Sequence, residues 1–232
     1  MERLDKLLAG TGRWSRKEVR ELIRAGRVSV DGKTAVKPEG KYDPACAVTV
    51  DREPVACGLI YLMLHKPAGV VTATEDRRQE TVLDLLPEYL RRAGLFPVGR
   101  LDKDTEGLLL LTNDGPLGHE LLAPKKHVDK TYFVRVDGAL DESDVSAFRA
   151  GMTLEDGTVC LSAGLEVLDR PEEGLVTLRE GKYHQIKRML AARGKPVAYL
   201  KRLTMGPLTL DEDLKPGAWR ELTAEERGAL GR

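Results

Sequence analysis

Three segments of the sequence carry side chains whose chemistry exceeds what packing requires. The first runs from Pro97 to Gly115 and holds Arg100, Asp102 and Thr105 just before four consecutive leucines. An arginine two residues from an aspartate favours the ionised carboxylate in a partly desolvated site. Such an aspartate can act as a nucleophile or as a base. An ion pair that braces a turn is the structural alternative.

The other two segments supply an aromatic hydroxyl and a group of basic side chains. Tyr132 lies near the start of an expected strand, and residues 181–189 place His184, Lys187 and Arg188 on one side of an expected helix. An aspartate, a tyrosine that stacks on a base and a lysine that pairs with the carboxylate would suit a flipped nucleobase. Packing of Tyr132 in a sheet, and a purely helical role for His184, are the alternatives.

Length and composition indicate a globular protein with one large domain or two smaller ones. The chain has 232 residues, of which 41% are hydrophobic and 5% aromatic. No apolar stretch approaches the roughly 20 residues that span a bilayer, and the first residues lack a signal peptide's apolar core. We therefore expect a cytoplasmic location and no membrane contact. The three cysteines and four histidines show no metal-ligand spacing, which predicts free thiols and no metal.

Positive charge is concentrated in two stretches, although 37 basic and 37 acidic residues cancel over the chain. The N-terminal basic stretch, residues 1–41, has eleven basic and six acidic residues, a net charge of +5. The C-terminal basic stretch, residues 179–202, has eight basic residues and one acidic residue, a net charge of +7. Two such patches indicate a polyanion held in two places, with solvated helix faces as the alternative.

The pattern of elements predicts two parts, residues 1–57 and residues 58–232. In the first, a helix precedes a second helix that Ser15 and Glu18 would cap, and a strand follows that turns at Asp31-Gly32. The second mixes strands and helices without a βαβ rhythm, which favours an α+β domain with a mixed, largely antiparallel sheet. We expect a linker over 51–58, strands over 59–65, 70–74 and 130–136, and helices over 81–86 and 184–193. The leucine run should be a buried strand closed by a hairpin turn at residues 113–115.

The first part resembles the S4 (αL-like) RNA-binding module through the segments RLDKLL and SRKEVRELIRAGRVSVDG. In that family the second helix and the following turn lie on structured RNA and read shape and phosphates more than sequence. A capping domain with a charged exterior is the alternative. The resemblance implies RNA contacts from Arg13, Ser15, Arg16, Lys17, Arg20, Arg24 and Lys33.

Four segments of the second part, LHKPAGVVTATED, PVGRLDKDTEGLLLLTNDG, KTYFVRV and EGKYHQIKRM, are similar to the pseudouridine synthases of the RsuA type. The likeness covers essentially the whole chain. It implies that Asp102 is the catalytic aspartate, that Tyr132 stacks on the target uracil and assists proton removal from C5, and that Lys187 is the counter-ion of the aspartate. It also implies that Ile186 lines the uracil pocket, that Arg100 shapes the loop, and that no cofactor is required.

The segment YHQIKRM resembles members that act on 16S rRNA, with the uridine conventionally numbered 516 as target, in a pre-ribosomal particle. Members that act on 23S rRNA more often carry an Asn-Arg pair there, and a 23S uridine is the first alternative. A non-catalytic ribosome-assembly factor is the second. A nucleoside or glycoside hydrolase is the third; it would require a second carboxylate, for which Asp104 and Glu106 are candidates by spacing. Asp104 is otherwise expected to be a turn residue.

Overall fold

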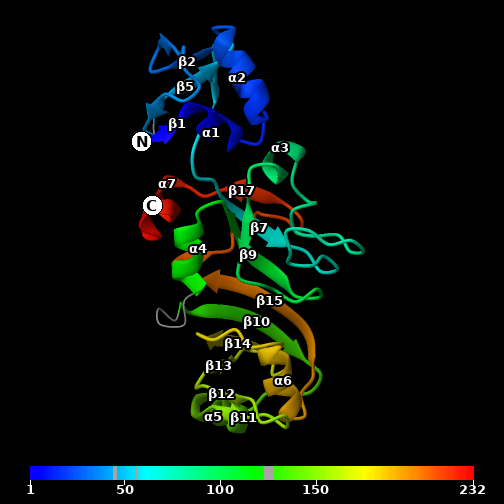
Figure 1. Cartoon of the computed structure of the whole chain (residues 1–232). Helices are drawn as coiled ribbons and strands as arrows, with labels where there is room; N and C mark the ends of the chain where they lie inside the picture. The colour runs from blue at the N-terminus through cyan, green and yellow to red at the C-terminus, as the bar shows by residue number, and fades with distance from the viewer. Residues whose placement is uncertain (44–45, 56, 123–127) are drawn as a thin grey trace.

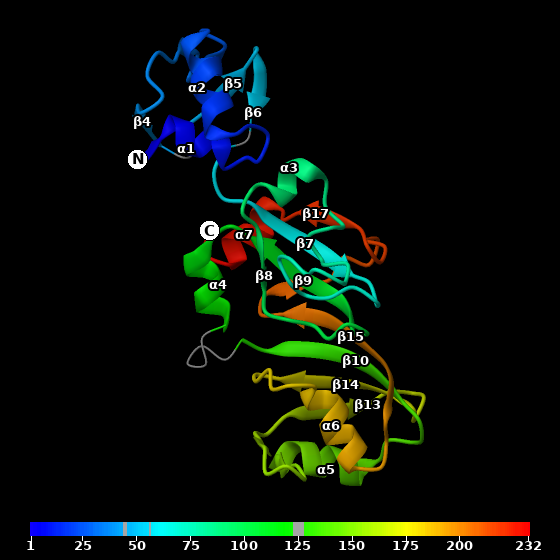
Figure 2. The same cartoon turned by 45° about the vertical axis from the view of Figure 1, so that its right-hand side comes forward.

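The computed structural model describes residues 1–43, 46–55, 57–122 and 128–232. The N-terminal elements form one end of an elongated molecule, and a large twisted sheet with its helices forms the remainder (Figures 1 and 2). None of the helices in the described ranges has the length and apolar character needed to cross a membrane. Within the same ranges, no group of three or more His, Cys, Asp or Glu side chains is placed to hold a metal ion.

The N-terminal part packs two helices against a small antiparallel sheet. Ser15 and Glu18 form the expected capping box, and the hairpin turn has positive φ at Asp31 (49°) and Gly32 (77°). Leu8, on the first helix, packs with apolar residues of the second helix and the sheet. The elements are β1 (Glu2–Arg3), α1 (Leu4–Ala9), α2 (Arg16–Arg24), β2 (Val28–Val30), β3 (Lys33–Thr34), β4 (Lys41–Tyr42), β5 (Val48–Val50) and β6 (Glu53–Val55).

The remaining elements are β7 (Tyr61–Lys66), α3 (Glu88–Arg91), β8 (Phe96–Val98), β9 (Glu106–Thr112), α4 (Gly115–Leu122), β10 (Lys130–Val136), α5 (Glu142–Ala150), β11 (Met152–Thr153), β12 (Val159–Cys160), β13 (Gly164–Val167), β14 (Glu173–Leu178), α6 (Gln185–Ala192), β15 (Val197–Met205), β16 (Leu208–Thr209), β17 (Trp219–Glu221) and α7 (Ala224–Ala229). The main sheet has the order β13-β14-β10-β15-β9-β7-β17. The β15–β9 pair is parallel, and the other neighbours in this order are antiparallel. This confirms the predicted α+β fold with a mixed, largely antiparallel sheet.

The four-leucine run is a strand because both faces of the sheet are covered at β9. Leu108 and Leu110 pack with residues of α4, whereas Leu109 and Leu111 pack in a separate cluster on the other face. Successive side chains in a strand point to opposite faces, so an uninterrupted apolar run fits a strand buried on both sides. The loop of residues 99–105, which carries Asp102 and ends where β9 begins, is therefore attached to the centre of the sheet.

Gly107 allows β9 to approach β15 closely at this point. Its φ is 111°, and an added Cβ would lie 2.2 Å from the carbonyl oxygen of Arg202. The Arg202 side chain is buried, and its Nε donates a hydrogen bond of 2.8 Å to the carbonyl oxygen of Leu108. Only glycine fits this contact without moving the backbone.

Several local predictions are wrong. Residues 113–115 do not close a hairpin: Asp114 accepts the backbone N–H of Leu117 and begins α4. Residues 81–86 form turns rather than a helix, and residues 70–74 contribute an isolated bridge between Val71 and Thr81 rather than a strand. The expected linker contains β6, which extends the N-terminal sheet. In each case the backbone N–H and C=O groups bond to short polar side chains or to another strand. Local sequence propensity does not reveal these partners.

Candidate active site

The loop that carries Asp102 is fixed by buried donors from the end of β7 and from the segment that follows it. The Thr72 hydroxyl donates to the carbonyl oxygen of Leu101 at 2.8 Å and accepts from its N–H at 3.2 Å. The ammonium group of Lys66, a fully buried residue, donates to the carbonyl oxygens of Lys103 (3.1 Å) and Thr105 (2.9 Å). These bonds flank Asp102 on both sides, so its backbone has little freedom.

Burial also affects the pKa of Lys66. Removal of the ammonium from water lowers its pKa to about 8, and the nearby Asp104 and Asp102 carboxylates only partly oppose this effect. Three carbonyl oxygens accept from the ammonium, including that of Pro67 at 2.9 Å. The loop is thus held by a cation that satisfies backbone acceptors rather than by an ordinary ion pair.

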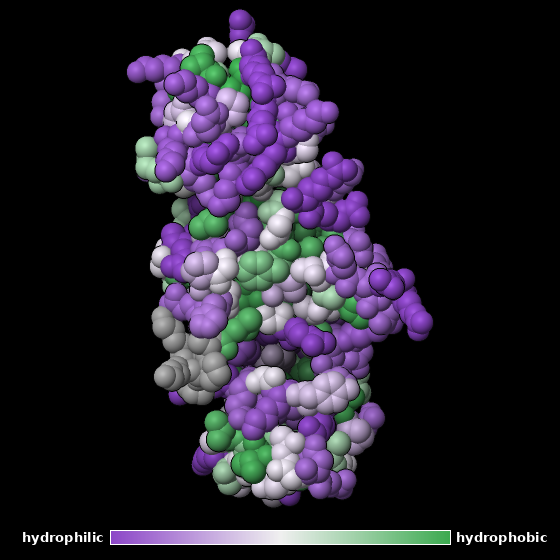
Figure 3. All heavy atoms as spheres, viewed as in Figure 1, coloured by the Kyte–Doolittle hydropathy of each residue, from purple (hydrophilic) through white to green (hydrophobic). Residues whose placement is uncertain are grey.

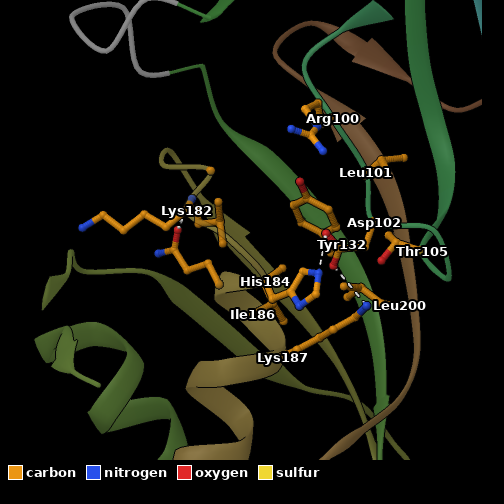
Figure 4. Close-up of a pocket in the computed structure, with 13 residues that line it drawn as sticks. Arg100, Leu101, Asp102, Thr105, Tyr132, Lys182, His184, Ile186, Lys187 and Leu200 are labelled. Atoms are coloured by element: carbon orange, nitrogen blue, oxygen red, sulfur yellow. Dashed lines mark hydrogen bonds and ion pairs between the residues drawn. The ribbon is translucent and has the colours of Figure 1, made fainter. Parts of the chain in front are cut away.

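The Asp102 carboxylate faces two cationic or ionisable groups from the start of α6 (Figure 4). Lys187 Nζ lies 3.0 Å from Asp102 Oδ2, and His184 Nε2 lies 3.4 Å from Asp102 Oδ1. Lys187 also pairs with Asp104. Burial disfavours the charged lysine, but its hydrogen bonds to Asp104 and Asp102 outweigh burial and raise the pKa of Lys187. Lys187 therefore remains a cation beside Asp102 throughout the neutral range.

A pocket next to this carboxylate is walled by apolar side chains and by one aromatic ring. Tyr132 is 8% exposed and Ile186 is 5% exposed, and both line the pocket with Leu101, Leu178 and Leu200. A register shift between Thr131 and Tyr132, where β10 pairs with β15, marks a local irregularity at this position. The Tyr132 ring lies between Arg100 and Asp102 in the view of Figure 4. A planar ring with polar edges would meet an apolar surface, a ring face and a carboxylate in this pocket.

The pocket includes a hydroxyl and a guanidinium that have no partner among the described residues. The Thr105 hydroxyl is buried and makes no hydrogen bond, and Arg100 makes no hydrogen bond or ion pair to a described residue. An unpaired guanidinium and an unpaired hydroxyl at one pocket are donors available to a bound molecule.

The pocket brings together the predicted site residues of the second part and leaves other candidates outside. Arg100, Asp102, Tyr132, Ile186 and Lys187 all line it. Asp104 and Glu106, the candidates for the second carboxylate of a hydrolase, do not line the pocket. Asp104 forms an ion pair with Lys187, and Glu106 accepts a hydrogen bond of 2.7 Å from the Tyr199 hydroxyl. Arg188 pairs with Asp156 instead of sharing the pocket with His184 and Lys187. The lining thus contains one carboxylate, which gives no support to a two-carboxylate hydrolase.

Sequence reasoning missed the residues that hold the loop. Lys66 was not singled out, although a lysine at the end of an apolar strand and directly before a proline is an unusual place for a charge. Thr72 gave no comparable signal, because its role depends on a backbone segment 29 residues away.

The C-terminal basic stretch is not a free patch, which corrects the prediction from charge. Arg202 is buried, and six other cations pair with carboxylates, most of them from distant segments. The ion pairs are Arg179–Asp129, Lys182–Glu180, Lys187–Asp102, Arg188–Asp156, Arg193–Asp144 and Lys195–Asp144. Most cations of this stretch are therefore engaged by carboxylates of the protein itself, and two of them, Lys182 and Lys187, line the pocket.

The N-terminal basic stretch does present free cations. The face over α2 is strongly hydrophilic (Figure 3). The side chains of Arg16, Lys17, Arg24 and Lys33 are exposed and form no ion pair with a described residue. Cations of this kind are available to phosphates.

Three predicted RNA contacts of the N-terminal part also have partners within the protein. Ser15 caps α2 by accepting the Glu18 N–H at 3.3 Å. Arg20 Nη2 lies 3.3 Å from the buried carboxylate of Asp5. The Arg13 guanidinium lies 5.9 Å from the centre of the Tyr89 ring on α3, which links the N-terminal part to the larger one.

Comparisons with known proteins agree with this architecture. The family model of RNA pseudouridylate synthase matches residues 60–192, and the S4 domain model matches residues 2–43. The ribosomal small subunit pseudouridine synthase A of Pseudomonas aeruginosa is 42% identical over 227 residues, which are 97% of this chain and 98% of that protein. The RNA pseudouridine synthase YtzG of Bacillus subtilis is 51% identical over 229 residues, 97% of this chain and 96% of that protein.

A crystal structure of a pseudouridylate synthase has the same fold. That protein is 33% identical, the match covers 99% of this chain and 100% of the other, and the two superpose with a TM-score of 0.70. Both the sequence matches and this structure span the N-terminal part as well as the sheet that carries the pocket. The chain therefore belongs to the RNA pseudouridylate synthases, as an enzyme that joins the catalytic fold of that family to an N-terminal S4 domain.

Proposed function

We propose that the protein converts one uridine of 16S rRNA, the uridine conventionally numbered 516, to pseudouridine, with Asp102 as the catalytic residue. The observation that carries this proposal is the pocket with a single carboxylate, which Lys187 pairs at 3.0 Å beside the Tyr132 ring. The choice of the small subunit is supported by full-length relatives named ribosomal small subunit pseudouridine synthase A and by the segment YHQIKRM.

The reaction needs no atom that the substrate lacks. The bond from ribose C1′ to uracil N1 breaks, the uracil turns, C1′ bonds to C5, the C5 proton leaves, and N1 gains a proton. Asp102 either attacks C1′ or removes the C2′ proton to give a glycal, and both routes require an ionised carboxylate. The Lys187 ammonium, 3.0 Å from Asp102 Oδ2, is the counter-ion of that carboxylate in either route.

The other pocket residues have complementary roles in the proposal. Tyr132 stacks on the uracil and assists removal of the C5 proton, and Ile186 bounds the ring on the apolar side. Arg100 lies on the loop beside Asp102 and offers its unpaired guanidinium to the sugar–phosphate of the uridine. These contacts would select a nucleotide that has been turned out of its stack.

The division of labour follows the two parts of the chain. We assign residues 1–57 to RNA binding and residues 58–232 to catalysis. Arg13, Ser15, Arg16, Lys17, Arg20, Arg24 and Lys33 form the proposed RNA face, with the exposed and unpaired members contributing most to affinity. A pre-ribosomal particle in the cytoplasm is the expected partner.

Mapping of pseudouridine in rRNA tests the proposal. Cells that lack the protein should lose one pseudouridine of 16S rRNA, and the wild-type gene should restore it. Loss from 23S rRNA instead would favour the first alternative. An unchanged rRNA map would overturn the rRNA substrate and leave the non-catalytic assembly factor.

The Asp102→Asn variant tests the catalytic assignment in the same cells and with purified protein. Pseudouridine formation should fall by a factor of about 1,000 or more, because the amide is neither nucleophile nor base, while RNA affinity changes little. Asp169→Asn, at an exposed aspartate remote from the lining of the pocket, is the matched control. Undiminished modification by Asp102→Asn would remove the assignment.

A further inference from the structure

Tyr183 is an aromatic side chain left open to solvent next to the pocket. It is 75% exposed, compared with 40% for Tyr89 and 8% for Tyr132. One face of its ring is stacked on the His184 ring, with centroids 3.9 Å apart and an interplanar angle of 18°. An exposed aromatic ring of this size offers its open face to a second planar group.

The backbone at His184 is in a conformation that side-chain-bearing residues seldom adopt. Its φ is 47°, in the left-handed region, at the residue that precedes α6. The Gln185 side chain fixes this turn, because its Oε1 accepts the Lys182 N–H at 3.1 Å and its Nε2 donates to Glu180 at 2.7 Å. A strained position that neighbours hold in place is typical of functional sites.

His184 connects the exposed ring to the catalytic carboxylate. Its Nε2 lies 3.4 Å from Asp102 Oδ1, while Tyr183 covers one face of the same imidazole. The two rings and the carboxylate therefore form one continuous layer from the uracil pocket to the surface. Tyr183 is fixed relative to the pocket although its own side chain is exposed.

A groove extends from the pocket along this layer. Tyr183 lines it, together with residues 100–103, which belong partly to the pocket, and with Val71, Thr72 and Ala73. The face seen in Figure 3 is hollowed at the level of β10 and α6. Arg100 and Lys103 bring positive charge to the groove, and the Lys103 side chain donates to Gln79 at 2.9 Å. A strand of RNA that places one base in the pocket would carry its next nucleotide into this groove.

We propose that Tyr183, backed by His184, is a stacking platform for the base of a nucleotide next to the target uridine. The proposal rests on the proposed RNA substrate and adds a second base-binding site to it. Stacking on an exposed ring tolerates any base, because every base has a π-face. The platform therefore holds the flanking strand in place while the target base is turned out, without reading its sequence.

Three variants separate stacking from other roles of Tyr183. Tyr183→Ala removes the ring, Tyr183→Leu keeps an apolar side chain without a ring, and Tyr183→Phe keeps the ring without the hydroxyl. Because base–aromatic stacking is a binding interaction, the Ala and Leu variants should lose about 5- to 100-fold in kcat/KM, mainly through KM, and the Phe variant should resemble wild type. The side chain is exposed, so stability should hardly change.

The substrate is a synthetic RNA that spans the uridine found by mapping, with an abasic site placed in turn on its 5′ and 3′ side. At the side that stacks, the abasic RNA should lower kcat/KM for wild type to the level of Tyr183→Ala, and the variant should show no further loss.

Equal kcat/KM for wild type and Tyr183→Ala on the intact RNA would overturn the platform. Equal losses for all three variants, Phe included, would also overturn it, because the hydroxyl would then be responsible. Failure of wild type to modify any RNA would instead overturn the proposed function.

Discussion

The two basic stretches of this chain differ in whether their cations form ion pairs within the protein. The C-terminal basic stretch has the higher net charge, +7 against +5. Six of its cations nevertheless pair with carboxylates and a seventh, Arg202, is buried. The N-terminal stretch leaves Arg16, Lys17, Arg24 and Lys33 exposed without an ion pair to a described residue. Local charge density therefore coincides with the proposed RNA face in one case and with the surroundings of the candidate active site in the other.

The difference lies in where the acidic partners come from. Asp129, Asp144 and Asp156 are distant in sequence from the cations that they meet, and Asp102 reaches Lys187 from 85 residues away. A paired cation is held in one geometry, which suits catalysis, whereas a free cation can release counterions on binding RNA. The two stretches should therefore respond to neutralisation in different measurements.

The largest effect on stability is expected at Asp144, a fully buried carboxylate held by two cations of the C-terminal stretch. Arg193 Nε donates to it at 2.9 Å, and Lys195 pairs with its other oxygen. Arg193→Gln combined with Lys195→Gln would leave the buried carboxylate without a cationic partner, at a cost of about 3 kcal/mol. Urea unfolding should show this loss at pH 7, while the salt dependence of RNA binding stays the same. Arg170→Gln, at a 71% exposed arginine 3.9 Å from Glu173, should change stability by less than about 0.5 kcal/mol.

The pH dependence of stability provides a second test of the Asp144 ion pairs. Burial alone would raise the pKa of Asp144, but its hydrogen bonds to Lys195, Arg193 and the Asp141 N–H outweigh burial and lower it. A lowered carboxylate pKa stabilises the fold above the unfolded pKa of about 3.9, and that contribution is lost as pH falls through the folded value. The gap between wild type and the double variant should therefore close below about pH 4. A gap that stays constant in acid would show that the two cations act through packing rather than charge.

Neutralising the free cations of the N-terminal stretch should alter RNA binding and leave stability unchanged. In the triple variant Arg16→Gln, Lys17→Gln and Arg24→Gln, fewer counterions are released on binding. The slope of log K against log salt should become shallower by about 2 to 3, with a matching loss of affinity at physiological salt and little change in kcat at saturating RNA. Filter binding at several salt concentrations measures the slope.

Arg27→Gln is the matched control for this variant, because Arg27 is also exposed on the N-terminal part but pairs with Asp51. It should change the slope less than any one of the three free cations. An unchanged slope in the triple variant would mean that α2 is a solvated helix face, and the comparison between the two stretches would then lose its functional meaning.

The extent to which sequence predicted these regions depends on the range of the interactions. The leucine run predicted β9, and the capping box predicted α2, because each depends on neighbours within a few residues. The hairpin expected at residues 113–115 was wrong because Asp114 is equally suited to cap a helix, and the helix that follows packs Leu117 and Leu121 against the sheet.

In the candidate site, too, the sequence predicted the residues that lie in motifs but not the contacts between distant segments. Motifs located Asp102, Tyr132 and Lys187, and the structure gathers them in one pocket. The motifs gave no indication of the Lys66 contacts under the loop or of the left-handed backbone at His184. Both arise from segments that meet only in the folded chain, where burial and backbone acceptors decide the outcome.

The smallest effect is expected at Ser15, which the resemblance assigns to RNA and the structure assigns to the end of α2. Its hydroxyl accepts the Glu18 N–H at 3.3 Å. Ser15→Ala should therefore cost about 1 kcal/mol of unfolding free energy while RNA affinity changes by less than about twofold. Ser15→Asp separates the two roles further: the carboxylate can replace the cap and keep stability, but its negative charge beside Arg16 and Lys17 should weaken RNA binding. If Ser15→Ala instead leaves stability intact and lowers affinity severalfold, the hydroxyl serves RNA, and even the capping end of α2 belongs to the RNA face.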